Sequence, residues 1–137
     1  MNRTEAVKLC RMIRALCPTQ PLDAYTPDAW AIVMADIRYD DAQQAITTLY
    51  RDRGNDQEFG GRRIEADDII REVRRIRERR LAEHPPIEPP DTVRSDAEYR
   101  QWLRTTRQAI ADGNVIQQPA LPRRDMTPLR QLVSRLQ

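Results

Sequence analysis

Apolar side chains recur every three or four positions along most of the chain, the spacing that lines one face of an α-helix. No stretch alternates apolar and polar residues for long enough to predict a β-strand. The first stripe predicts a helix over residues 5–16, with Thr4 as its N-cap and Pro18 beyond its end. Its apolar residues are Ala6, Leu9, Cys10, Ile13, Leu16 and, just past the end, Cys17.

Two further helices follow in the next forty residues or so. Thr26, Pro27 and Asp28 supply a capping threonine, a proline for the first helical position and an acid near the positive helix end. The buried face of this helix is predicted to be Trp30, Val33, Met34 and Ile37. A third helix is predicted from near Asp40 to Gly54, with an inner side of Ala42, Ala45, Ile46, Leu49 and Tyr50.

A fourth helix is predicted over residues 66–83, after a glycine-rich loop that contains Phe59. Acids occupy its first turn and arginines its last turns, and both arrangements suit the helix dipole. Its inward residues are Ile69, Ile70, Val73 and Ile76. Beyond Ile76 only Leu81 continues the apolar pattern, so we expect the arginine-rich end to project past the core, into solvent or against a partner.

Four prolines in six positions, Pro85, Pro86, Pro89 and Pro90, interrupt the helical pattern. Because each proline fixes φ and removes a backbone donor, they predict a stiff, extended spacer. The fold class is therefore all-α: a small four-helix N-terminal domain (residues 1–83), a proline-rich linker (84–94) and a partly disordered tail (95–137) with one or two amphipathic helices.

The tail carries two apolar stripes. Ser95 and Glu98 form a capping box that opens a helix ending at Gly113, and Thr127 and Pro128 open a short last helix. The first tail helix has two open interpretations: it folds back on the first domain as a fifth helix, or it binds a partner. For the last helix, docking onto a partner protein is the favoured interpretation. The candidate partner-binding residues are Tyr99, Trp102, Leu103, Leu129, Leu132 and Leu136.

Net charge, cysteine spacing and the length of apolar runs argue against several classes of protein. A net charge of +2 over 44 charged residues argues against a protein that coats polyanions. Cys10 and Cys17 are too far apart on one helix for a local disulfide, which indicates buried thiols in a reducing compartment. No apolar run is long enough to cross a membrane and the first residues do not form a signal peptide, so we expect a soluble cytoplasmic protein.

The residues that catalysis needs are scarce. His84 is the sole histidine and lies beside the prolines, and Gly60 and Gly61 lack the rest of a phosphate-binding loop. The Asp40-Asp41 and Asp67-Asp68 pairs both fall at predicted helix starts, where capping accounts for them. These features predict a protein that is not an enzyme, with no metal, no cofactor and no small-molecule substrate.

Six arginines crowd the end of the fourth predicted helix: Arg71, Arg74, Arg75, Arg77, Arg79 and Arg80. They are candidate contacts for nucleic acid or an acidic partner, although the long loop before this helix and its acidic start do not fit a helix-turn-helix. The competing interpretation is a solvated helix face of Arg–Glu pairs. The alternative function is thus a DNA-binding regulator of transcription or replication that uses residues 71–80.

A resemblance to a known protein family extends over about residues 4–83. It depends mainly on two segments, YTPDAWAIVMADIRYDDAQQAITTLYRD and IEADDIIREVRRIRERRL. Together with the first amphipathic helix, they resemble the phage proteins that load and inhibit the replicative DnaB-type helicase. The resemblance implies an all-helical N-terminal domain, a C-terminal region that contacts the helicase hexamer, and transfer of the helicase to an initiator protein. The resemblance also implies that the protein is located in the cytoplasm of the bacterial host. A further alternative function is inhibition of another host protein by a phage protein.

Overall fold

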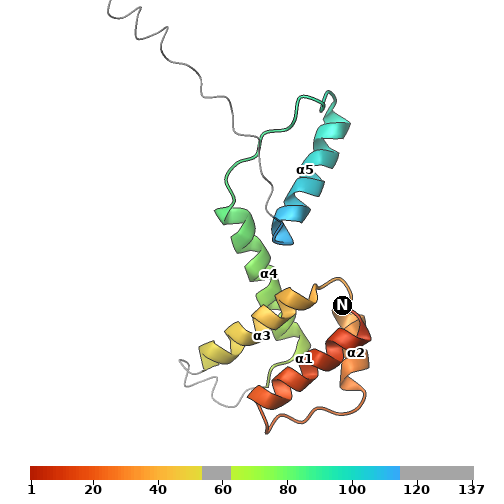
Figure 1. Ribbon diagram of the computed structural model, residues 1–137, viewed down its shortest axis with the longest axis vertical. Helices are drawn as coiled ribbons and strands as arrows, with labels where there is room; N and C mark the ends of the chain where they lie inside the picture. Colours follow the sequence, from red (N-terminus) through yellow and green to blue (C-terminus); the bar gives the residue numbers. More distant parts are fainter. Residues whose placement is uncertain (54–62, 115–137) are drawn as a thin grey trace, which may run out of the picture.

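Five α-helices are present in the computed structural model, which describes residues 1–53 and 63–114 (Figure 1). They are α1 (Arg3–Leu16), α2 (Thr26–Val33), α3 (Tyr39–Arg53), α4 (Ala66–Glu83) and α5 (Asp96–Ala111). The described residues include no β-strand, so the all-helical prediction is confirmed. Phe59 and the last predicted helix, with Leu129, Leu132 and Leu136, lie outside the described residues.

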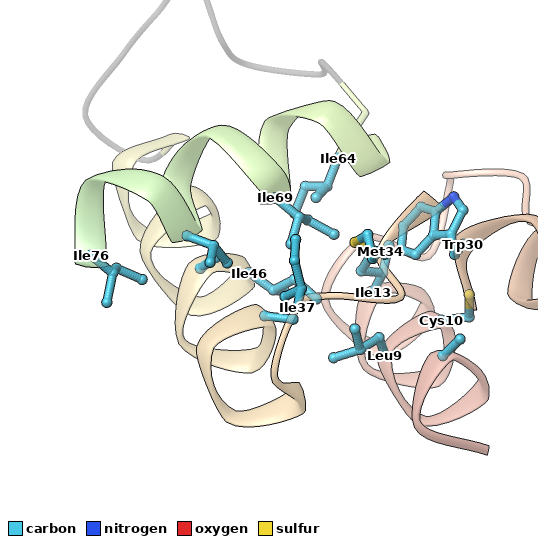
Figure 2. Packing of buried hydrophobic residues seen from close by; sticks show 14 residues of the cluster. Leu9, Cys10, Ile13, Trp30, Met34, Ile37, Ile46, Ile64, Ile69 and Ile76 are labelled. Atoms are coloured by element: carbon cyan, nitrogen blue, oxygen red, sulfur yellow. The ribbon is translucent and has the colours of Figure 1, made fainter. Parts of the chain in front are cut away.

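The hydrophobic core lies among α1, α2, α3 and the first half of α4 (Figure 2). Leu9, Ile13, Met34, Ile46 and Ile69 are all fully buried there. Burial of each such side chain contributes about 1.5–3 kcal/mol, which makes this cluster the main source of stability. The cluster takes its buried residues from the chain between Ala6 and Ile76 and includes none from α5.

Several details differ from the sequence-based predictions. The N-cap of α1 is Asn2 rather than Thr4, because Asn2 and Glu5 form a reciprocal capping box that starts the helix earlier. Val33 was predicted to be buried but is 57% exposed, since α2 ends at Val33 and the chain turns there toward α3. Tyr50 is also exposed, at 43%, on the last turns of α3.

At the start of α2, Asp23 performs the capping role that was predicted for Thr26. Its carboxylate accepts the backbone N–H groups of Tyr25 and Thr26, at 2.9 and 2.7 Å, and the Thr26 hydroxyl at 2.9 Å. These hydrogen bonds, that of the Thr26 hydroxyl first, hold the pKa of Asp23 below its usual value. The start of α2 is therefore fixed from outside the helix, three residues upstream.

The buried side chain of Gln20 fixes the approach to α4. Its amide donates to the Ile64 carbonyl and accepts from the Ile64 N–H, both at 2.9 Å, in the manner of a short strand pair. Ile64 is itself buried, so water cannot replace these bonds. This contact ties the turn after α1 to the residues that precede α4 and places Ile69 against the core.

Replacement of Gln20 with alanine is expected to lower the free energy of unfolding by about 2 kcal/mol, because it leaves the N–H and C=O of Ile64 buried without partners. Urea unfolding followed by circular dichroism measures the change. Gln43→Ala, at an exposed position of α3, is the matched control and should shift stability by no more than about 0.5 kcal/mol. Equal effects of the two substitutions would contradict the assigned role of Gln20.

Helix α5 lies beside the C-terminal half of α4 and runs antiparallel to it (Figure 1). Ser95 and Glu98 form the predicted capping box, and Gly113 follows the helix at a φ of +82°, so both predicted ends of this helix are confirmed. The irregular segment with the four prolines connects the two helices. We call α4, this segment and α5 the hairpin; the first half of α4 packs in the core, and the rest of the hairpin extends away from α1, α2 and α3 (Figure 1).

Candidate binding surface on the hairpin

The C-terminal end of α5 is held to the rest of the molecule by three arginines. Arg80 donates to the Ala111 carbonyl at 2.9 Å, Arg38 donates to the Asp112 carbonyl, and Arg77 pairs with the Asp112 carboxylate at 3.0 Å. The last carbonyls of a helix carry a partial negative charge, so guanidinium groups stabilise this end. Ile110 and Ala111 are buried at the same contact. Helix α5 is thus fixed chiefly at its last turn.

Arg80 also forms an ion pair with a buried carboxylate of α3. Its Nη2 lies 2.7 Å from Oδ1 of Asp41, whose side chain is only 3% exposed. The other carboxylate oxygen, Oδ2, has no hydrogen-bond partner among the described residues. Because a buried charge is costly when unpaired, Asp41 depends on Arg80. One guanidinium group therefore joins α3, α4 and the end of α5.

The six arginines predicted as candidate contacts have three different environments. Arg71 and Arg75 pair with acids three residues earlier on α4, Asp68 and Glu72, each at 3.3 Å. This matches the interpretation of a helix face with paired charges for these two residues. Arg77 and Arg80 contact the end of α5 instead, through Asp112 and the Ala111 carbonyl. Arg74 and Arg79 are exposed and form no ion pair within the part of the chain that the structure describes.

A groove runs between α4 and α5 and has a volume of about 410 Å³. Its lining residues are Arg74, Arg77, Glu78 and Leu81 from α4, and Arg104, Arg107, Gln108 and Ala111 from α5. We call it the basic groove. A second hollow of about 430 Å³ shares Arg74, Arg77 and Gln108 with it and continues toward Val33 and Ile37. The sequence analysis did not single out Arg104 and Arg107, although their spacing of three already placed them on one helix face.

The predicted aromatic residues of α5 lie outside the basic groove, although the hollow beside Trp102 shares Leu81 and Arg107 with it. The rings of Tyr99 and Trp102 are in contact, with centroids 5.7 Å apart and planes tilted by 32°. Trp102 and Leu103 are half-buried beside the proline segment and line a hollow of about 220 Å³ with residues 84–87. Tyr99 is 43% exposed near the beginning of α5. Of the three, Tyr99 is the most accessible to a partner.

Other kinds of site find little support among the described residues. No group of three or more histidine, cysteine, aspartate or glutamate side chains gathers there in a way that would hold a metal ion. Within the same residues, no helix has the length and apolar character required to cross a membrane. Burial raises the pKa of the Cys10 thiol, which makes its thiolate less available. No family model, curated protein or solved structure matches this chain.

Proposed function

We propose that this protein is a DNA replication accessory protein of the phage type, which binds a replicative DnaB-type helicase in the bacterial cytoplasm and loads or inhibits it stoichiometrically. The observation that carries the proposal is the hairpin, which extends from the helical core (Figure 1). Tyr99 and several arginines are exposed on it. A projecting element with exposed aromatic and arginine side chains is suited to contact a large partner.

The resemblance to helicase loaders and inhibitors supports the choice of partner, and it covers residues with structural roles in this chain. Trp30 and Ile69 are core residues, and Asp41 is the buried partner of Arg80. Because these residues are buried, the shared sequence pattern reflects the fold of the N-terminal helices and does not identify the surface that contacts the helicase. We therefore place the helicase contact elsewhere, on the exposed surface of the hairpin and in residues 115–137.

The proposed action needs no chemistry from this protein. By occupying a surface of the helicase hexamer, it would restrain ATP hydrolysis and unwinding, both of which belong to the helicase. An initiator protein bound at an origin would then release the restraint. The binding energy of a protein–protein interface is concentrated in a few residues, and tyrosine, tryptophan and arginine are the commonest among them. Tyr99 is our first candidate, followed by Trp102 and Leu103.

An ATPase titration tests this proposal. Addition of the protein to the purified replicative helicase of its host should lower the ATPase rate, with saturation at a fixed molar ratio. Tyr99→Ser should raise the concentration needed for half of the effect by roughly tenfold, the loss expected for one aromatic contact of about 1.4 kcal/mol. Tyr50→Ser is the matched control, because Tyr50 has the same exposed fraction of 43% but lies on α3.

An ATPase rate that stays constant at a large excess of the protein would contradict the proposed function. An equal loss for Tyr99→Ser and Tyr50→Ser would contradict only the role of Tyr99, and it would leave residues 115–137 as the remaining candidate for the contact. Circular dichroism of both variants establishes that each is folded.

A further inference from the structure

The basic groove contains more positive charge than its own carboxylates balance. Four arginines and one glutamate, Glu78, are among its lining residues. Arg77 is paired with Asp112, but Arg74, Arg104 and Arg107 have no ion pair among the described residues. Like charges that line one groove repel one another, and an anion bound between them would relieve that repulsion. The groove therefore has the electrostatic character of an anion site.

The arrangement of the arginines favours an elongated anion. The three arginines that have no ion pair among the described residues come from both walls, Arg74 from α4 and Arg104 and Arg107 from α5. Arg104 and Arg107 are three residues apart, so their Cα atoms are separated by about 4.5 Å along the axis of α5. The second hollow shares Arg74 and Arg77 with the groove and is also lined by Asp36, so the positive charge is concentrated on the side of the groove that Arg104 and Arg107 line. A ligand with several linked negative charges can contact arginines on both walls, whereas a single small anion balances only part of this charge.

The remaining lining residues indicate what the groove does not recognise. Leu81 and Ala111 are apolar, Gln108 is polar and uncharged, and none of the lining residues is aromatic. The groove thus offers no surface for base stacking and few groups for reading base edges. Its arginines instead supply planar donors that match phosphate oxygens.

We propose that the basic groove binds the phosphate backbone of a nucleic acid strand without sequence preference. A nucleic acid carries a negative charge on every nucleotide, so a short stretch of one strand supplies an anion for each of Arg74, Arg104 and Arg107, whereas an acidic protein segment does so only where several carboxylates are clustered. This site goes beyond the helicase contact proposed above and does not depend on it. It extends the nucleic-acid candidates from α4 to Arg104 and Arg107 of α5.

Fluorescence anisotropy with labelled oligonucleotides tests the proposal on the full chain. A single strand and a duplex of about 20 nucleotides, each in two unrelated sequences, are titrated at about 50 mM salt and then at rising salt. We expect binding that is independent of sequence, and the two strand forms distinguish which kind of nucleic acid the groove accepts. The double variant Arg104→Gln/Arg107→Gln should weaken binding at least tenfold.

The same variant should also change the salt dependence. Loss of two phosphate contacts reduces the slope of log K against log salt by about 1.4 for a single strand or about 1.8 for a duplex. The matched control is Arg11→Gln/Arg51→Gln, which removes the same charge from exposed positions of α1 and α3. The control should change affinity less than twofold, and thermal melting should establish that both variants are folded.

Three outcomes would overturn the nucleic-acid site. They are no binding of either strand form by the full chain at low salt, equal losses for the groove variant and its control, and full displacement of the oligonucleotide by a poly-glutamate peptide of similar charge at equal concentration. The last outcome would assign the groove to an acidic protein segment. None of these measurements involves the helicase, so their failure is distinguishable from failure of the proposed function.

Discussion

Replacement of Arg80 with methionine should lower the free energy of unfolding by about 3 kcal/mol, because the substitution leaves the Asp41 carboxylate buried without a counter-charge. Oδ2 of Asp41 already lacks a hydrogen-bond partner among the described residues, so nothing else in that part of the chain compensates for the loss. The bond to the Ala111 carbonyl would also disappear, which weakens the attachment of α5. Urea unfolding followed by circular dichroism measures the stability.

Two further variants isolate the ion pair. Arg79→Met removes a neighbouring arginine that is exposed and has no ion pair in the described regions, and it should change stability by less than about 0.5 kcal/mol. The double variant Asp41→Leu/Arg80→Met removes both charges and should recover much of the stability lost in Arg80→Met. A double variant no more stable than Arg80→Met would contradict the role assigned to Asp41.

The helices themselves were predictable because short-range rules determine them. The apolar spacing of α4 and the acids in its first turn predicted residues 66–83, which are its observed bounds. Ser95 and Gly113 defined α5 in the same way. Two errors occurred at helix starts, where Asn2 and Asp23 perform the capping roles predicted for Thr4 and Thr26. Two more occurred at Val33 and Tyr50, whose place on an apolar stripe did not lead to burial.

The candidate site was less predictable because it depends on contacts between distant residues. Asp41 and Arg80 are 39 positions apart, and each alone has the character of a surface residue at a helix end. Nothing in the local pattern distinguishes Arg77 and Arg80, which hold α5, from Arg71 and Arg75, which pair along α4. The basic groove exists only because α5 lies beside α4, so its second wall of arginines was not evident from either helix alone.

Removal of residues 95–137 should abolish helicase binding and leave the N-terminal helices folded. The buried residues of the main hydrophobic cluster all come from the chain before the prolines, and the ion pair between Arg80 and Asp41 involves no residue of α5. The shortened chain would lose Tyr99 and the other tail candidates, including Leu129, Leu132 and Leu136, and with them the contacts that we expect to carry most of the binding energy. A cooperative thermal transition would establish that it is folded.

The central claim is that this protein binds a replicative helicase through its hairpin and tail. The most direct measurement is a pull-down of the purified helicase of the host on the immobilised full chain and on the chain that ends at residue 94, each with and without ATP. The account predicts retention of the helicase in a fixed molar ratio on the full chain with ATP, and loss of retention on the shortened chain. Absence of retention on the full chain in both nucleotide states would contradict it, as would equal retention on both chains.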